Sequence, residues 1–236
     1  MQTTRSLTDE QLAHYHEHGY VVVNDVFPID ELQQMNRELD AIIKACERGE
    51  IQNRKPAAGW LMALGLLTES TRDFCEDERI LNLIDRIVYP GIAIYSAKLV
   101  SKEPRDETIC HWHQDDAYYT QNSDSACRMS IWVPLQDTTK EQGCLQLVPG
   151  SHRQGLQPYS KRQTGTCALA MDIDVDMSKR IYLPAKAGSM VLFSALLWHA
   201  SDGNTTENRR RAFIVSYQEA TAKAGNGQQW KILRDA

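Results

Sequence analysis

The sequence predicts a mainly β domain, a sandwich or barrel, with helices packed at its N-terminal end. Two observations predict this class. Helical patterns fill the first ninety residues, and many short strand-like segments separated by Pro/Gly turns follow Pro90. A chain of 236 residues can also bury a sizeable core without disulfides or a structural metal. We therefore expect a single domain over 1–236, with helical support over 1–90 and the β core over 91–220.

The expected N-terminal elements follow from capping residues and apolar spacing. Thr8 and Gln11 form a capping-box pattern, and Gly19 is a natural helix stop. Pro28 opens a second helix with a regular apolar face, which Gly49 ends. The predicted elements are a helix over 8–18, a strand over 20–23, a helix over 28–48 and a third helical region over 72–88.

The segments after Pro90 alternate or cluster apolar residues over short lengths. We expect strands over 92–100, 128–135, 144–148, 181–183, 190–199 and 211–218, and an aromatic-rich segment over 109–119. Residues 153–176 are polar and irregular. A loop of that length inside a domain is usually functional or mobile.

Composition narrows the class of partner. Lys and Arg number 26 against 31 Asp and Glu, a net charge of -5, which argues against nucleic acid. The first five residues lack the apolar region of a secretory signal, and the longest uncharged run, 56–68, is shorter than the roughly 20 residues that span a bilayer. We expect a small-molecule substrate, no nucleic acid and no membrane, with the oligomeric state open. Six cysteines without a CxxC pair predict reduced thiols in a cytoplasmic protein: Cys46, Cys75, Cys110, Cys127, Cys144 and Cys167.

The densest group of chemically active residues runs from Cys110 to Asp116. Alternate side chains of a strand share a face, so His111, His113 and Asp115 are expected to point together and Asp116 away. His-x-Asp supplies two-thirds of the facial triad that leaves open positions on Fe(II). The motif alone is weak, and a solvated pair is an equally good interpretation.

A third ligand would have to be a distant histidine. His14 and His18 are an i,i+4 pair among polar residues and are expected on a solvated face, while His152 follows a turn that it could cap. His199 ends the apolar run 190–198, where a histidine needs a buried partner or a metal. A satisfied core histidine remains the alternative.

Three consecutive arginines follow His199. An arginine that enters a strand on an inward face needs an anion, which a dicarboxylate would supply through bidentate hydrogen bonds. Arg210 shares strand phase with Ala212 and Ser216, as a cavity-facing row would, whereas Arg209 is expected in a solvated loop. Ser201 shares the face of His199 if its strand continues.

These motifs, in this order, resemble the phytanoyl-CoA dioxygenase (PhyH) family from about residue 7 to 220. The matching residues are His113-Gln114-Asp115, Trp132, Gly143-Cys144-Leu145, Val148 to His152, Gly188, His199-Ala200-Ser201, Asn204 and Arg210. The resemblance implies a double-stranded β-helix, a jelly roll of the cupin kind. It also implies an oxidoreductase that uses Fe(II), 2-oxoglutarate as cosubstrate and O2.

Site roles carried over from the resemblance are expectations. Iron would be held by the catalytic residues His113, Asp115 and His199. The cosubstrate would contact Arg210 and Ser201 through its distal carboxylate, Trp132 through an aromatic face, and Lys98 as a looser match. A further cosubstrate lysine of some relatives has no clear counterpart, Lys55 being only a guess. Substrate contacts are expected among Trp60, His111, Tyr118, Tyr119 and Tyr159, each of which could equally be aromatic core.

The implied reaction is hydroxylation, or another oxidative change, of a C–H bond in a small polar metabolite or natural-product intermediate, with 2-oxoglutarate converted to succinate. Related halogenases replace the motif carboxylate with a small residue, and Asp115 is retained here, so we expect oxygenation, with dealkylation or desaturation as possible net outcomes.

One alternative is an acyl-CoA hydroxylase, with Arg153, Lys161 and Arg162 near the phosphates. Others are a non-catalytic metal-binding sensor or scaffold, and a thiol nucleophile at Cys110 beside His111.

Overall fold

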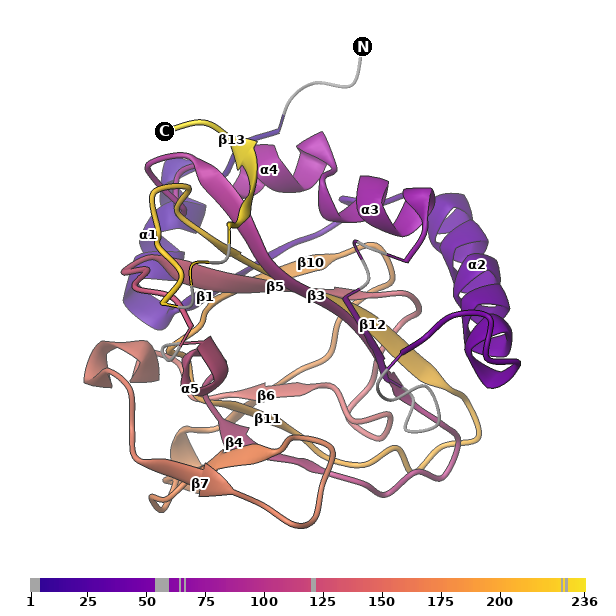
Figure 1. Ribbon diagram of the computed structural model, residues 1–236. Helices are drawn as coiled ribbons and strands as arrows, with labels where there is room; N and C mark the ends of the chain where they lie inside the picture. The colour runs from indigo at the N-terminus through magenta and orange to yellow at the C-terminus, as the bar shows by residue number, and fades with distance from the viewer. Residues whose placement is uncertain are drawn as a thin grey trace.

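Two antiparallel sheets lie one above the other in the computed structural model, with the N-terminal helices on the outer side of the larger sheet (Figure 1). The structure describes residues 5–53, 60–63, 65, 67–119, 122–225, 227 and 229–236. The larger sheet has the order β1-β10-β5-β12-β3-β13, with β2 also paired to β3, and the smaller has the order β4-β11-β6-β9. The expectation of a mainly β protein with N-terminal helices is confirmed.

The strand bounds are as follows. The larger sheet contains β1 (Tyr20–Val23), β2 (Trp60–Met62), β3 (Ile92–Lys102), β5 (Arg128–Pro134), β10 (Met190–Ser194), β12 (Arg210–Gln218) and β13 (Lys231–Arg234). The smaller sheet contains β4 (Cys110–His113), β6 (Leu145–Leu147), β9 (Ile181–Leu183) and β11 (His199–Ser201). A separate hairpin joins β7 (Tyr159–Lys161) to β8 (Leu169–Met171).

The helices form where the capping pattern predicts them, with one exception. In α1 (Asp9–His18) the Thr8 side chain accepts a bond from the Gln11 amide, and Gly19 ends the helix in a left-handed conformation. Next comes α2 (Ile29–Glu47). The region expected as one helix over 72–88 is two, α3 (Glu69–Cys75) and α4 (Glu78–Ile84), because Asp77 caps a new helix start. A single turn, α5 (Asp116–Tyr119), follows β4.

Alternation along β5 divides the interior into two layers. Ile131 and Val133 belong to the core under the helices, whereas Trp132 belongs to the cluster between the two sheets. The same division applies to β10, where Leu192 faces the helices and Phe193 faces the smaller sheet. The space between the sheets is therefore lined by one face of each, and the site lies there.

The apolar run 190–199 was expected to be one strand and is not. β10 ends at Ser194, and residues 195–198 carry the chain across to the smaller sheet, where β11 begins at His199. Turn-forming hydrogen bonds inside an apolar stretch, such as Leu197 N to Ser194 O, leave no trace in hydropathy. This crossing places His199 directly opposite His113 on β4.

Two further elements differ from expectation. The segment 153–176, expected as an irregular loop, contains the β7–β8 hairpin, paired from Tyr159–Met171 to Lys161–Leu169. A C-terminal strand, β13, pairs with β3 beyond the expected core. In the described part of the chain, no helix is long and apolar enough to cross a membrane.

Candidate active site

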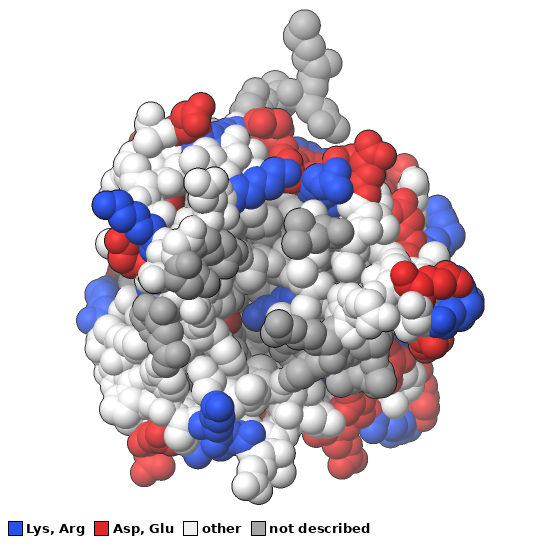
Figure 2. Space-filling model, in the orientation of Figure 1, with Lys and Arg blue, Asp and Glu red and all other residues white. Residues whose placement is uncertain are grey.

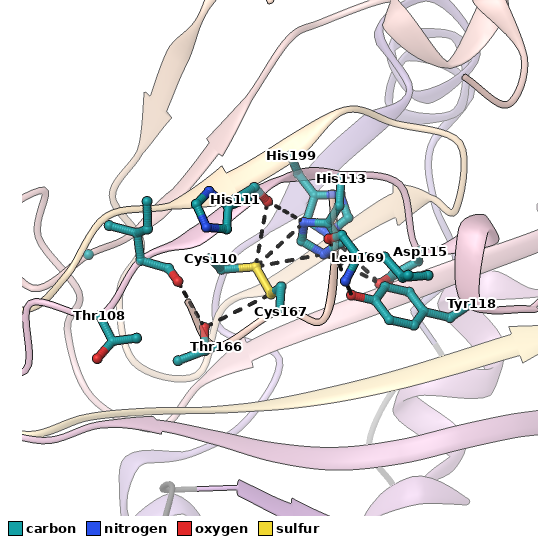
Figure 3. The surroundings of a disulfide bond; sticks show 12 residues. Thr108, Cys110, His111, His113, Asp115, Tyr118, Thr166, Cys167, Leu169 and His199 are labelled. Carbon is teal, nitrogen blue, oxygen red and sulfur yellow. Dashed lines mark hydrogen bonds and ion pairs between the residues drawn. A yellow bond between two sulfur atoms is a disulfide. The ribbon is translucent and has the colours of Figure 1, made fainter. Parts of the chain in front are cut away.

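His113, Asp115 and His199 converge between the two sheets. The Nε2 atoms of both histidines lie 3.9 Å from Oδ1 of Asp115, and the two rings are 4.0 Å apart between centroids. All three side chains are buried, and one ligand atom from each lies within 4.8 Å of the others. Figure 3 shows the rings side by side with Asp115 next to them. Two imidazoles and one carboxylate make a donor set that suits a transition metal.

Hydrogen bonds leave the same nitrogen of each ring facing inward. Nδ1 of His113 bonds the His111 carbonyl at 2.8 Å, and Nδ1 of His199 bonds the Leu197 carbonyl at 2.9 Å. A backbone acceptor of this kind orients a metal-binding imidazole and leaves Nε2 free to coordinate. The site is therefore arranged for a metal through its backbone as well as through its three side chains.

The protonation states also suit a metal. Burial lowers the pKa of both His113 and His199, so both rings are neutral at neutral pH. Burial would raise the pKa of Asp115, but Lys98, His199 and His113 outweigh it and lower that pKa to about 2. Neutral imidazoles and an ionised carboxylate are the forms that coordinate metals.

The local geometry differs from the simple strand predicted for this motif. β4 ends at His113, so Asp115 lies in the turn before α5. The β4–β11 pairing shifts register between His199 and Ser201, which face His113 and Cys110 respectively. This bulge breaks the alternation, so Cys110 lines the cavity in place of His111. The expectation that His111 shares the face of His113 is wrong; its ring bonds the Thr164 carbonyl.

A chain of hydroxyl groups holds the second oxygen of Asp115. Ser130 donates to Asp115 Oδ2 at 2.6 Å, Ser130 bonds Ser216 at 2.9 Å, and Ser216 bonds Tyr119 at 2.9 Å. Sequence reasoning missed Ser130, whose one visible signal is a small polar residue inside an apolar strand. The chain leaves Oδ1 as the oxygen that faces the histidines.

The three convergent residues line one wall of a cavity of about 520 Å³. Figure 2 shows a hollow on this face of the molecule, with basic side-chain atoms visible inside it. The residues that matter below fall into two groups. The first group is Arg210, Ser201 and Trp132, whose ring lies 5.6 Å from the Arg210 guanidinium carbon. The second, around Lys98, is Met62, Tyr95, Ser96, Tyr118 and Tyr119, while Phe193 packs against the His199 ring.

Arg210 and Lys102 are two buried cations side by side. They are paired residues on β12 and β3, with exposed fractions of 2% and 1%. Burial, and then the Arg210 charge, lower the pKa of Lys102 to about 7, while burial lowers the pKa of Arg210 to about 10. Arg210 donates to the Gly143 carbonyl and Lys102 to the Thr108 carbonyl, and Nε of Arg210 has no hydrogen-bond partner among the described residues. Adjacent buried cations with an orphaned donor fit an anion.

The neighbouring charged residues are accounted for by other contacts. Arg211 donates to Asp40 of α2 at 2.6 Å, on the helix side of the sheet, while Arg209 is more exposed and bonds Glu103. Asp116 points away from the histidines and pairs with Arg128. Arg210 is thus the arginine of the three that lines the cavity.

The expected substrate-contact residues divide between cavity and surroundings. Tyr118 and Tyr119 line the cavity; His111 and Tyr159 are not among its lining residues. Lys55 and the side chain of Trp60 lie outside the described residues. Lys98 lines the cavity on the Tyr118 and Tyr119 side, with Nζ 3.9 Å from Asp115 Oδ1.

A disulfide bond joins Cys110 of β4 to Cys167 of the β7–β8 hairpin, with 5.0 Å between their Cα atoms (Figure 3). The expectation of reduced thiols is wrong for this pair, and a thiol nucleophile at Cys110 is excluded while the bond is formed. The bond spans 57 residues, and the fold of the hairpin back onto β4 brings the two together. The other cysteines, Cys46, Cys75, Cys127 and Cys144, are free thiols.

Gln114, between two of the convergent residues, ties three segments together. Its amide nitrogen donates to the carbonyls of Gly155 and Leu196 at 2.9 and 2.7 Å, and its oxygen accepts from the Gln157 amide at 2.8 Å. The side chain is 1% exposed. The root of the hairpin and the turn before His199 are thereby linked to the turn that holds Asp115.

Sequence comparison finds one family that spans most of the chain. Residues 15–212 match the family described as phytanoyl-CoA dioxygenase (PhyH). The human peroxisomal phytanoyl-CoA dioxygenase is 27% identical over 91% of this chain and 69% of its own length. A probable alpha-ketoglutarate-dependent hypophosphite dioxygenase from Stutzerimonas stutzeri is 24% identical over 90% of this chain and 79% of its own length.

Solved structures show the same fold. The non-heme monooxygenase ThoJ superposes with a TM-score of 0.80 at 20% identity, covering 95% of this chain and 83% of its own. EctD from S. alaskensis, solved with 2-oxoglutarate and 5-hydroxyectoine, superposes with a TM-score of 0.76 at 19% identity, covering 92% and 78%.

Proposed function

The chain belongs to the phytanoyl-CoA dioxygenase (PhyH) family, and on that premise we propose that it is an Fe(II)/2-oxoglutarate-dependent oxygenase acting on a small polar metabolite or natural-product intermediate. One observation carries the proposal. The His113–Asp115–His199 group and the Arg210 guanidinium, with its orphaned Nε, line the same cavity. A metal-binding donor set and a buried anion site in one cavity match the two requirements of this chemistry.

Iron would be held by Nε2 of His113, Nε2 of His199 and Oδ1 of Asp115. Two histidines and one carboxylate are the set used by non-haem Fe(II) oxygenases, and they leave room for other ligands. When bound, iron and 2-oxoglutarate supply the oxidising chemistry, with O2 as oxidant and succinate and carbon dioxide as coproducts. Ser130 keeps Asp115 in place by bonding the oxygen that does not face the histidines.

The cosubstrate would place its distal carboxylate against Arg210 and Ser201. Arg210 offers a guanidinium whose Nε lacks a partner among the described residues, and Trp132 lies with its ring 5.6 Å from the Arg210 carbon. Lys102, directly opposite Arg210, would supply a second cation for the same carboxylate. The Trp132 ring would keep water away from the Arg210 guanidinium, and Phe193 would do the same beside His199.

We assign oxygenation, most simply hydroxylation, and not halogenation. Asp115 occupies the position of the metal carboxylate and is held there by Ser130 at 2.6 Å. Asp115 would thus fill the metal position that a halogenase leaves open for chloride, and iron held by these three residues would supply oxygenation. Dealkylation or desaturation would be the net outcome if the same oxidation of a C–H bond took place on a suitable substrate.

The alternative of an acyl-CoA hydroxylase receives less support from the hairpin. Arg162 pairs with Asp172 at 3.0 Å, and Arg153 donates to the Glu17 carbonyl at 2.8 Å. Two of the three basic residues expected near coenzyme A phosphates are therefore engaged within the protein. A non-catalytic sensor or scaffold would not need the orphaned Arg210 donor in the same cavity as the metal-binding residues.

We also infer that the two facing sheets form a double-stranded β-helix and that residues 1–236 make one domain. The support is the pairing of β4 with β11 in one sheet and of β10 with β5 in the other, with the site between them. The superposition on ThoJ and EctD over more than nine-tenths of the chain supports this architecture.

The test is succinate formation from 2-oxoglutarate with Fe(II), ascorbate and a metabolite panel, followed by mass spectrometry of the product under labelled oxygen and excess chloride. Succinate together with an oxygenated product supports the proposal. A chlorinated product contradicts the assignment of oxygenation, and absence of both metal and 2-oxoglutarate binding contradicts the enzyme class.

A further inference from the structure

Lys98 places an ammonium group inside the cavity on the metal side. It projects from β3, where it is paired with Ile214 of β12 and Met62 of β2. Its side chain is 14% exposed, and Nζ lies 3.9 Å from Asp115 Oδ1. A cation in this position acts on whatever occupies the space between the metal group and Tyr118 and Tyr119.

Lys98 is far from the cosubstrate anion site. Four residues along β3 separate Lys98 from Lys102, the partner of Arg210, and at the rise of a β-strand this is about 13 Å. The two cations of the distal carboxylate site therefore leave the sheet four positions along β3 from Lys98, and Trp132, in the same cross-strand row as Lys98, lies between them. Aromatic and small polar side chains, including Tyr95 and Ser96, surround the Lys98 end.

The charges at the site do not balance without a further anion. Among the described lining residues, Asp115 is the one carboxylate, whereas Lys98 and Arg210 are both cations. On the proposed function, a ferrous ion adds two positive charges, and Asp115 with 2-oxoglutarate supplies three negative ones. At least one positive charge is left over, and Lys102, opposite Arg210, adds another when it is protonated. A buried charge is costly without a counterion, so an anionic substrate stabilises the filled site.

We propose, resting on the function proposed above, that the substrate carries a free oxyanion, a carboxylate or phosphonate, which Lys98 binds close to the C–H bond that is oxidised. The tyrosines would contact the apolar body of the same molecule. A coenzyme A thioester has no free carboxylate at its acyl end, so the inference also favours a free acid over an acyl-CoA.

The experiment uses the protein loaded with Mn(II) and 2-oxoglutarate, which permits binding without turnover. Calorimetric titrations compare benzoate with benzamide and hexanoate with hexanamide, and phenylphosphonate forms a separate arm. The variants are Lys98→Met, which keeps the length of the side chain, and the matched control Lys179→Met, a lysine with 71% side-chain exposure. Affinities for Mn(II) and for 2-oxoglutarate are measured first for each protein.

We expect each acid to bind the wild type and Lys179→Met at least about tenfold tighter than its amide, the size of one charge-assisted hydrogen bond. Lys98→Met should remove that preference and leave 2-oxoglutarate affinity within about twofold. The tighter of carboxylate and phosphonate identifies the oxyanion.

Three results overturn the inference: amides that bind as well as acids, no binding by either, or a preference that survives in Lys98→Met. A parallel loss of 2-oxoglutarate affinity in Lys98→Met also overturns it and assigns Lys98 to the cosubstrate. A wild type that binds neither Mn(II) nor 2-oxoglutarate instead contradicts the proposed function, and the first titrations show this separately.

Discussion

Lys102 and Arg210 lie directly opposite each other on β3 and β12, both buried, and the pKa of Lys102 is lowered to about 7. Like charges in opposed positions of a sheet repel, so this pair costs stability until an anion lies near it. The pair therefore makes the place where we propose that the cosubstrate binds sensitive to pH.

The first prediction follows from that pKa. Below about pH 7 Lys102 is an ammonium and attracts the distal carboxylate; above it the lowered pKa leaves a neutral amine, so binding must take up a proton. We expect 2-oxoglutarate affinity to fall as pH rises from 7 to 9, by up to about tenfold per unit. Titrations of the Mn(II)-loaded protein, repeated for Lys102→Met, measure it. A slope that persists in Lys102→Met contradicts the assignment.

Removal of either metal-site histidine should abolish metal binding without unfolding the protein. His113→Ala or His199→Ala deletes one of three ligands, and we expect Mn(II) affinity to fall at least about 100-fold. Mn(II) electron paramagnetic resonance measures the binding, and circular dichroism reports the fold. His14→Ala is the matched control, because His14 packs on His18 and Tyr20 at the surface. Near-normal metal affinity in either site variant would show that the triad assignment is wrong.

Arg210 and Arg211 should separate cosubstrate binding from stability. Arg210→Ala removes a charge-assisted contact, so the binding free energy of 2-oxoglutarate should weaken by about 2–3 kcal/mol while the affinity for the metal stays nearly unchanged. Arg211→Ala breaks the contact with Asp40 of α2 and should instead lower the free energy of unfolding by about 1–2 kcal/mol. Titration and urea unfolding of both variants test the contrast. A larger loss of 2-oxoglutarate affinity in Arg211→Ala than in Arg210→Ala would show that Arg211, not Arg210, binds the cosubstrate.

The disulfide should stabilise the protein through the hairpin. A disulfide between residues 57 positions apart lowers the conformational entropy of the unfolded chain, which adds about 2–4 kcal/mol to the free energy of unfolding. Reductant should therefore lower the urea midpoint. Cys110→Ser with Cys167→Ser should show the same lowered midpoint and no response to reductant. Cys46→Ser, a free thiol, should retain the response. If reductant leaves the wild-type midpoint unchanged, the bond does not stabilise the fold.

Local chemistry explains the features that were predictable. Some features depend only on residues close in the chain, among them the Thr8 capping box and the Gly19 stop. The same holds for the row of Arg210, Ala212 and Ser216, because alternate residues of a strand share a face and this predicts that Arg210 lies on the face of the other two. His199 was recognised because a histidine at the end of an apolar run has to be satisfied. The metal and cosubstrate roles of these residues stay predictions.

The features that were missed depend on which strands lie together. Ser130 reaches Asp115 because β5 of the larger sheet faces the turn that follows β4 of the smaller one, and Lys102 meets Arg210 through the register of β3 with β12. Cys110 faces inward because of a bulge opposite β11, and it meets Cys167 through the hairpin. Register, bulges and disulfide pairing arise from long-range packing, which the spacing of residues along one segment does not encode.

Gln114 constrains how this protein can diverge. Its amide is bonded to Gly155, Gln157 and Leu196, so a change at the root of the hairpin also disturbs the turn between His113 and Asp115. The hairpin tip, from Lys161 to Leu169, has no bond to that amide, but Thr164 and Cys167 attach it to β4 through His111 and Cys110. New specificities should therefore be sought at Thr166 and Ala168, tip residues that line the cavity without taking part in those two side-chain links.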